Sequence, residues 1–523
     1  MLRRFAFQNG NDSRLQCNHN NSTIAMQRCL SLVFITILNQ ATVLEGFQPV
    51  TQQIIRRRLS TTMMSKSTSS DLKASTCTTK ENGRFPSREL LIHWRGEKDV
   101  GYSKPFRQLE FASALLAELK VPTEGESMLQ FQNALNYNGQ AQMADVNVEH
   151  FNEAMQFVTL NEEACSEDIQ VPRNAIISTV KRSALVHACY EVIAASENIE
   201  ELAELAVQDG GFQDMYKGGT NEKATWCFRA RNYGDIPAVA TETVVGKEKR
   251  YSSSARSMKL EKEGLKALTE LLLKFGGKVD LLNPDCKIYI FDGLEGGMKM
   301  LARRIAVGPR TSIIAPATRI CITNTPLEPI ASFSLCNVAR ICNDMAILDP
   351  YAGSCATLMA SAMIAPHSQT VGIEIAHNGI VNRDDIRKDF SSRNLTLPVA
   401  LLQGDSTNQT IREEAKAAIR NRPFDAIIAD PPYGIRESLS YNDKSPLEEL
   451  FASIAKDRQA NERLLRKGGR LVAFVAVTDE ETLEEMLPGE DLAREAGLAF
   501  EVSREQPLND KLSRWLVSYI CKE

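Results

Sequence analysis

The tetrapeptide Asp430, Pro431, Pro432 and Tyr433 is the stretch of this chain best suited to chemistry. It follows the apolar run Ala426–Ala429, which predicts a short buried strand. Two successive prolines fix two backbone angles and remove two N–H donors, so the strand must end there in a stiff loop. The Asp430 carboxylate and the Pro431 carbonyl can accept hydrogen bonds from a planar exocyclic amino group, and Tyr433 can stack on the base that carries it. We therefore predict a site that holds a nucleobase amino group toward a methylsulfonium; the alternative is a Pro-Pro turn that only caps a strand.

Three strands expected earlier in the chain also lead into acids. They are Met345–Asp349, Thr370–Glu374 and Val399–Leu402, the last running on to Gly404-Asp405-Ser406. Because the carboxyl ends of parallel strands meet at one edge of a sheet, we expect these acids to share a crevice with Asp430. One acid at a strand end is ordinarily a solvated cap; four at one edge favour a binding site.

The first of these strands and the segment after it have the strand-turn-helix form that begins a nucleotide-binding sheet. It runs into Pro350-Tyr351-Ala352-Gly353-Ser354 and then into a helix of small residues, 356–364. Glu374 follows Gly353 by 374 − 353 = 21 residues, close to the ~20 expected for an acid that holds ribose hydroxyls. Carboxylates suit the sulfonium and hydroxyls of S-adenosylmethionine but would repel a pyrophosphate, and the turn lacks a full G-x-G-x-x-G, which disfavours NAD. The predicted cofactor-binding residues are Asp349, Tyr351, Gly353, Glu374, Asp405 and Ser406.

Length and composition limit the possible domain organisation and kinds of binding site. A chain of 523 residues with 43% hydrophobic residues is expected to hold about three domains with packed cores. A net charge of −5 excludes a strongly basic protein, so any nucleic-acid surface must be a local patch. The 12 cysteines form no C-x-x-C pair, which indicates a reducing compartment and predicts no metal site.

The first 85 residues differ from the rest in composition. The apolar run Cys29–Leu38 is too short to span a bilayer but resembles a signal-peptide core, and Thr51–Ser70 is basic and lacks acids, as transit peptides do. Together they resemble the bipartite plastid presequences of algae with complex plastids. We expect residues 1–85 to be a targeting or disordered presequence, with a translation start at Met63 or Met64 as the alternative, and no stable membrane insertion of the mature chain.

The middle of the chain alternates strand-like and helix-like segments. We expect a small α+β domain at 86–210, including a helix over Phe106–Lys120 and a helix-like segment over Ala175–Ala195, and then a Gly-rich linker. A second unit at 211–312 contains a predicted helix, Lys259–Phe275. The basic stretch Lys247–Lys259 suits phosphate contacts, with Arg303, Arg304 and Arg310 as an extension; a solvated loop is the alternative.

In the last domain, 313–523, we expect Arg463–Gly469 to end a helix in a Gly-Gly turn.

The motifs Asp349–Ser354, Gly372-Ile-Glu374, Gly404-Asp405 and Asp430–Glu437 together resemble tRNA guanine-N2-methyltransferases of the Trm-eleven type. The tail Gln506–Trp515 is also similar to the C-terminus of that family. The segment Gly276–Asp285 between two predicted strands resembles a THUMP RNA-binding domain, and the unit before it resembles the ferredoxin-like domain that often precedes THUMP.

The resemblance implies an α/β fold with a Rossmann-like seven-stranded methyltransferase domain after the two RNA-binding domains. It implies methylation of N2 of a tRNA guanosine, usually at position ten, with Asp430, Pro431, Pro432 and Tyr433 as catalytic residues. It also implies a small zinc-binding activator subunit and a cytoplasmic enzyme, whereas the presequence points to a plastid or mitochondrion. Cys355 stands where the family usually has a second glycine.

Three other methylation targets and one non-catalytic function stay open at this point. The same loop fits other planar amino groups, namely rRNA guanine N2, adenine N6 of DNA or RNA, and a protein glutamine amide. A catalytically inactive RNA-binding relic is the alternative from another class.

Overall fold

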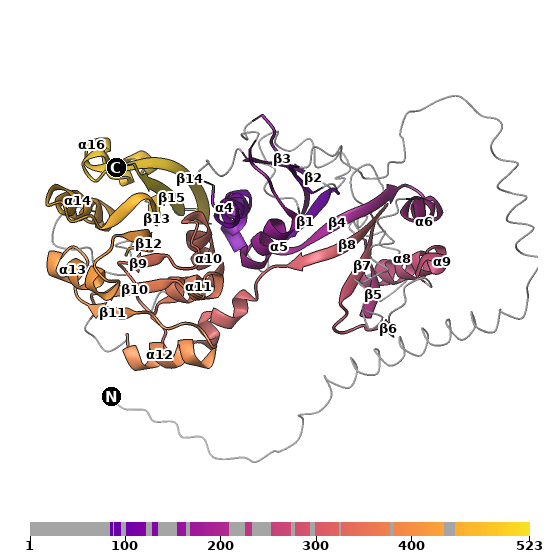
Figure 1. The fold of residues 1–523 in the computed structure, drawn as a ribbon, viewed down its shortest axis with the longest axis horizontal. Coiled ribbons are helices and arrows are strands. Elements are labelled where there is room, and N and C mark those ends of the chain that lie inside the picture. Colours follow the sequence, from indigo (N-terminus) through magenta and orange to yellow (C-terminus); the bar gives the residue numbers. More distant parts are fainter. Residues whose placement is uncertain are drawn as a thin grey trace, which may run out of the picture. The chain divides into compact units, whose positions relative to one another are not determined.

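The C-terminal half of the chain folds around a seven-stranded sheet in the computed structural model (Figure 1). The structure describes residues 84–86, 88–95, 101–121, 128–133, 154–163, 168–208, 225–232, 253–272, 278–292, 299–323, 326–376, 381–432 and 445–522. The strands of this sheet, in chain order, are β9 (Ala346–Asp349), β10 (Gln369–Glu374), β11 (Ala400–Gln403), β12 (Phe424–Ala429), β13 (Leu465–Thr478), β14 (Leu498–Asn509) and β15 (Leu512–Cys521).

Their order in space is β11-β10-β9-β12-β13-β15-β14. The strands from β11 to β13 are parallel, and β15 runs antiparallel between β13 and β14. This arrangement confirms the predicted Rossmann-like seven-stranded domain. The chain reverses its direction of winding between β9 and β12, which is where open α/β sheets bind ligands.

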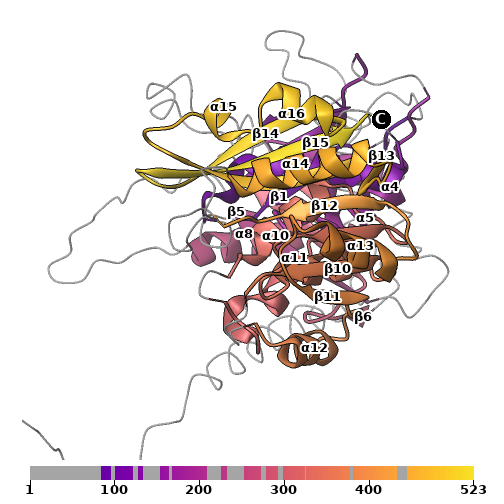
Figure 2. The same ribbon diagram turned by 90° about the vertical axis from the view of Figure 1, so that its left-hand side faces the viewer.

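Helices cover both faces of this sheet (Figures 1 and 2). One face packs against α10 (Pro329–Val338), α11 (Ala356–Ile364) and α12 (Arg383–Ser392), and the other against α13 (Gln409–Ala418), α14 (Pro446–Gln459), α15 (Leu483–Met486) and α16 (Glu490–Glu495). Strand β12 shows why the run was apolar without a break: Ala426 and Ile428 face the first core, and Ile427 and Ala429 face the second.

An eight-stranded sheet precedes this domain, with the order β2-β3-β1-β4-β8-β7-β5-β6. Its strands are β1 (Leu90–Trp94), β2 (Leu129–Asn133), β3 (Met155–Leu160), β4 (Val186–Ser196), β5 (Thr225–Asn232), β6 (Lys278–Val279), β7 (Cys286–Asp292) and β8 (Lys299–Val307). The helices are η2 (Gly101–Phe106), α4 (Arg107–Leu119), α5 (Arg173–Arg182), α6 (Ile199–Gln208), α8 (Ser253–Ala267) and α9 (Thr269–Leu272). Two 3-10 turns, η7 (Thr311–Ile314) and η8 (Pro316–Thr318), lead into the second sheet.

Strands of both predicted small domains join in this sheet, because β4 pairs with β1 on one side and with β8 on the other. The division at residue 210 stays a prediction, and so does the THUMP-like character of the second part. Residues 74–523 form one compact unit. None of the helices described is long and apolar enough to cross a membrane.

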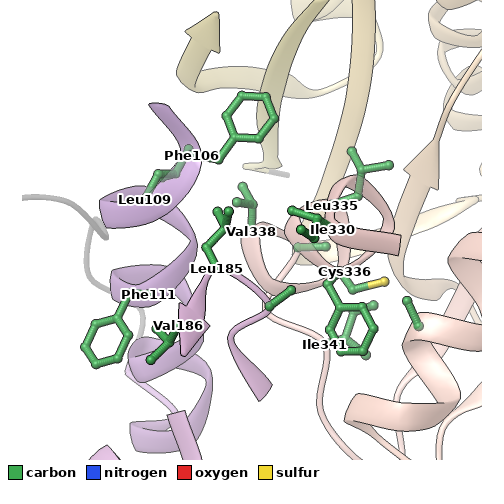
Figure 3. Close-up of a cluster of buried hydrophobic side chains, with 14 of the residues drawn as sticks. Phe106, Leu109, Phe111, Leu185, Val186, Ile330, Leu335, Cys336, Val338 and Ile341 are labelled. Atoms are coloured by element: carbon green, nitrogen blue, oxygen red, sulfur yellow. The ribbon is translucent and has the colours of Figure 1, made fainter. Parts of the chain in front are cut away.

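Helices α4 and α10 pack together in one core, which links the two sheets (Figure 3). Leu109 and Leu185 contribute to it from one side, and Leu335 and Val338 from the other. A buried polar network crosses the same contact. Asn337 donates to Glu110 (2.8 Å) and accepts from Arg182 (2.9 Å), so neither amide atom lacks a partner.

Three sequence-based expectations about elements are wrong. Ala175–Ala195 is not one helix: α5 ends at Arg182 and β4 follows, and β4 is buried on both faces, which removes the period of two that marks a strand. The helix predicted from Lys259 begins at Ser253 instead. Arg463–Gly469 does not end a helix, because β13 already begins at Leu465 and bulges there to pass Asp425.

Several predictions concern residues outside those the structure describes. They are the presequence up to residue 83, the linker Gly210–Thr220, the segment 247–252 of the basic stretch, and Tyr433 with the rest of its motif to Glu437.

Candidate active site

The four predicted acids lie at the carboxyl ends of four adjacent strands. Asp349 and Glu374 end β9 and β10, Asp430 follows β12 directly, and Asp405 follows β11 by two residues. Since β10 and β12 both pair with β9, only one strand separates Glu374 from Asp430. The structure therefore brings the acids to one edge of the sheet, as the sequence predicted.

Asp349 is buried beneath the turn that follows β9. Its two oxygens accept hydrogen bonds from the Tyr351 N–H (3.0 Å) and from the Thr357 hydroxyl of α11. The pKa of Asp349 is raised to about 7: burial is the largest cause and the charges of Asp430 and Glu374 add to it, whereas the two hydrogen bonds act in the opposite direction. The three carboxyl groups thus sense one another, and a cation placed among them would be stabilised.

Glu374 holds the same turn from its other side. Its Oε2 accepts from the Gly353 N–H at 2.7 Å, and its Oε1 accepts from the Ala376 N–H at 2.8 Å. Gly353 has φ of +49°, a conformation that suits glycine. Cys355 also has a positive φ, +63°, at the N-cap of α11, which gives a physical reason for a glycine at that position in the family.

A pocket of about 350 Å³ opens beside this turn. Ala352, Gly353 and Cys355 line it from the turn and Glu374 from β10; its remaining walls come from Gly372, Ala376, Val381, Asn382, Arg383, Ile386, Leu401, Leu402 and Gln403. Gly372 forms the floor, because a Cβ there would lie 2.9 Å from the Cβ of Ala352. One carboxylate, the polar side chains of Asn382, Arg383 and Gln403 and several apolar side chains fit a flat base attached to a ribose.

Several predicted cofactor residues lie outside this pocket. Tyr351 ties the turn to the start of α14 through its hydroxyl, which donates to the Pro446 carbonyl at 2.7 Å, and it also bonds the buried Ser406. Asp405 is exposed, and its Oδ1 accepts from the N–H (2.8 Å) and hydroxyl (2.7 Å) of Thr407. Of the catalytic set, Asp430 and Pro432 are half-buried and Pro431 is buried.

The pocket residues on α12 were missed from the sequence. Asn382 caps this helix, accepting from the N–H groups of Asp384 (2.8 Å) and Asp385 (3.3 Å). Asn followed by acids in the first turn is a recognisable helix-start signal, and it could have placed Asn382 and Arg383 beside the end of β10. Ile386 and Leu401 gave no signal beyond being apolar.

Comparisons with known proteins agree with this geometry. Residues 316–502 match the RMKL-like methyltransferase domain of UPF0020. The chain is therefore similar to the UPF0020 methyltransferases over residues 316–502. Methyltransferases of this family and fold use S-adenosylmethionine. The pocket beside Glu374, with the acids of the neighbouring strand ends close by, fits that cofactor.

Two kinds of curated relative align with the chain. The tRNA (guanine(10)-N(2))-methyltransferase TRMT11 of Xenopus laevis is 28% identical over 302 residues, which cover 49% of this chain and 60% of the relative. The U6 snRNA (guanine-N(2))-methyltransferase THUMPD2 of Bos taurus is 25% identical over 206 residues, 39% of this chain and 35% of the relative. The chain thus matches well under two thirds of the length of either relative.

Among solved structures, TrmN from Thermus thermophilus aligns with 83% of this chain and 99% of its own, at 16% identity and a TM-score of 0.36.

Proposed function

We propose that this protein is an S-adenosylmethionine-dependent methyltransferase acting on the exocyclic N2 of a guanosine in tRNA, with position ten as the target. The observation that carries the proposal is the adjacency of Asp430, Asp349 and Glu374 at one sheet edge, next to a pocket of suitable size and character. The similarity to the TRMT11 relatives supports guanine N2 and tRNA as the target.

Glu374 and the Gly353 turn would hold the cofactor's ribose, and the walls around Ile386 and Leu401 its base. Asp405 would accept from the adenine amino group. When bound, S-adenosylmethionine supplies an electrophilic methyl group. The remaining work of the site is to place a nucleophile and to stabilise charge.

Asp430 and Pro431 would perform that work. The lone pair of an exocyclic amino group is conjugated into its ring, so the nitrogen is a poor nucleophile. Hydrogen bonds from the amino group to the Asp430 carboxylate and the Pro431 carbonyl would hold the lone pair outward and stabilise the positive charge that develops on nitrogen. Pro432 stiffens the loop, and Tyr433 would stack on the extruded base.

We also propose that the eight-stranded sheet comprises the ferredoxin-like and THUMP-like domains and contacts the RNA. A small zinc-binding activator subunit is proposed as a partner from the family resemblance.

The test is in vitro methylation of total tRNA with labelled S-adenosylmethionine, with and without the activator, followed by mass analysis of nucleosides and mapping of the modified position. We expect N2-methylguanosine, and we expect Asp430→Ala to lower turnover about 10²-fold or more, as loss of an electrostatic stabiliser does. Asp491→Ala, which replaces an exposed acid of α16, is the matched control and should keep wild-type turnover. Near-normal turnover of Asp430→Ala would refute the catalytic assignment.

A second candidate target is a guanosine of a spliceosomal RNA, because the THUMPD2 relative aligns as well. The same assay with U6 snRNA separates the two: methylation of snRNA without methylation of tRNA would replace the first proposal. Absence of cofactor binding in equilibrium dialysis would instead favour the inactive relic.

A further inference from the structure

The two faces of the eight-stranded sheet differ in the elements and side chains that pack on them. Helices α4, α5, α6 and α8 pack on one face, where Cys189, Ile193 and Leu301 lie in apolar cores. The opposite face has its own apolar layer, in which Tyr190, Tyr289 and Phe291 pack edge-on or stacked with ring centroids 4.8–5.6 Å apart.

Cations lie in register beside this aromatic layer. Lys287 of β7 is directly opposite Arg304 of β8, and Arg304 is in turn opposite Tyr190 of β4. On the other side of Lys287 comes Cys227 of β5, and Arg229 follows two residues later on the same face. We call Arg229, Lys287 and Arg304 the cation row.

Like charges directly opposite each other on neighbouring strands destabilise a sheet. The cation row shows this strain: burial lowers the pKa of Lys287 below its ordinary value, and Arg304 and Arg229 lower it further. Asp280 acts in the opposite direction, but its Oδ1 already accepts from the N–H groups of Leu282 (2.8 Å) and Asn283 (3.0 Å).

The arginines that reach Glu191 on the helix-covered face of this sheet are neutralised. Arg303, next to Arg304 but on the helix-covered face, pairs with Glu191 at 2.6 Å, and Glu191 also binds Arg173. Within the residues described, by contrast, Lys287 and Arg304 form no ion pair, whereas Arg229 pairs with Glu261 of α8 at 3.7 Å and donates to the Leu281 carbonyl at 3.1 Å. This corrects the expectation that Arg303 and Arg304 would extend one basic patch together.

We propose that the cation row is a binding site for the phosphate backbone of the RNA substrate. The proposal rests on the proposed function, since it requires that the substrate be RNA. Arg231 continues the row along β5, about 7 Å beyond Arg229 at the rise of a strand, so the positive charge extends as a line that suits a polyanion rather than one small anion. Because the whole chain carries a net charge of −5, such a local line is the form that an RNA-binding surface must take here.

The experiment measures binding of fluorescently labelled tRNA to the full chain by anisotropy over a range of NaCl concentrations. The variants are Lys287→Gln/Arg304→Gln, the charge-retaining Lys287→Arg/Arg304→Lys, and the control Lys262→Gln/Lys266→Gln. The control removes two exposed lysines from α8, on the opposite face of the sheet.

We expect the first variant to lower the slope of log K against log salt by about 1 to 2 and the affinity at physiological salt on the order of tenfold. Its thermal midpoint should stay equal or rise, because a like-charge contact is relieved, and its affinity for S-adenosylmethionine should not change. The charge-retaining variant and the control should keep the wild-type slope.

Methylation kinetics separate this proposal from the function on which it rests. For the first variant, KM for tRNA should rise while kcat at saturating tRNA stays the same. A wild-type slope in that variant, or an equal loss in the charge-retaining variant, would overturn the site even if the protein methylates tRNA. Absence of methylation by the wild-type protein would instead count against the proposed function.

Discussion

Replacement of Asp389 tests how the turn after β9, residues 350–354, is held in place. This side chain of α12 is fully buried, and its carboxylate accepts from the Arg319 side chain (2.9 Å), the Ile320 N–H (2.9 Å), the Cys321 N–H (3.0 Å) and the Arg393 side chain (2.8 Å). Arg319 also donates to the carbonyl of Ser354, in the turn that lines the pocket. Asp389 thereby fixes the segment Arg319–Cys321 before α10 directly, and the turn at Ser354 through Arg319.

Asp389→Asn keeps the shape but removes the charge. The Arg319 side chain, only 3% exposed, would then be left without a counter-charge. Breaking a buried pair costs about 3–5 kcal/mol, and we expect the lower end because Asn retains one accepting oxygen. A loss of about 3 kcal/mol in a domain of roughly 200 residues lowers the thermal midpoint by about 10 °C.

The assay is thermal unfolding of the full chain, together with calorimetric titration of S-adenosylmethionine. Asp384→Asn is the matched control, since this acid lies on the same helix and pairs with Arg387 at 3.1 Å, but both side chains are exposed; its midpoint should move by about 1 °C or less. Adding Arg319→Met to Asp389→Asn should recover part of the loss, because the orphan charge is gone. A midpoint for Asp389→Asn within 2 °C of the control would refute the reasoning, where about 10 °C is expected.

The pH dependence of stability follows from the direction in which this network shifts the pKa of Asp389. Burial acts to raise the pKa of Asp389, but the hydrogen bonds from Ile320, Cys321 and Arg319 outweigh it, and the pKa is lowered overall. A carboxyl with a lowered folded-state pKa contributes stability above its unfolded pKa and loses it as pH falls through the folded value. Acid unfolding below about pH 4 should therefore be less steep in Asp389→Asn than in the wild type.

Two further changes test other parts of the fold and site. Gly308→Ala would place a Cβ 1.9 Å from the Val186 carbonyl oxygen, so we expect the free energy of unfolding in chemical denaturation to fall by about 3 kcal/mol. Gly489→Ala is the control and should behave as wild type, because no atom lies within 4 Å of the Cβ that it adds. Equal stability of the two variants would contradict the close approach of β8 and β4. Burial raises the pKa of Asp349 to about 7, so affinity for the cationic cofactor should increase from pH 6 to pH 8 as the carboxyl ionises, and Asp349→Asn should flatten that profile in titration calorimetry.

The parts of the site that were predicted from the sequence are those with local signals. Asp349, Glu374 and Asp430 each follow a short apolar run, and the rule that parallel strands end at one edge then places them together. The walls of the pocket were not predictable in this way. Ile386 and Leu401 are ordinary apolar residues, and only the packing of α12 beside β11 makes them part of a site.

The first sheet was less predictable because its pairing is not local. Strand β4 joins β8, so that Glu191 meets Arg303, more than a hundred residues along the chain. No periodicity in either segment indicates that partner. Burial of β4 on both faces also removed the alternation that would have identified it as a strand rather than a helix.

The shared packing of α4 against α10 limits where this chain can be truncated. A fragment that begins near residue 313 would retain the whole seven-stranded sheet, yet it would expose Ile330, Leu335 and Val338, all less than a tenth exposed in the intact chain. It would also leave Asn337 without its Glu110 and Arg182 partners. Such a truncated protein should aggregate more readily than the full chain, because it exposes a contiguous apolar patch.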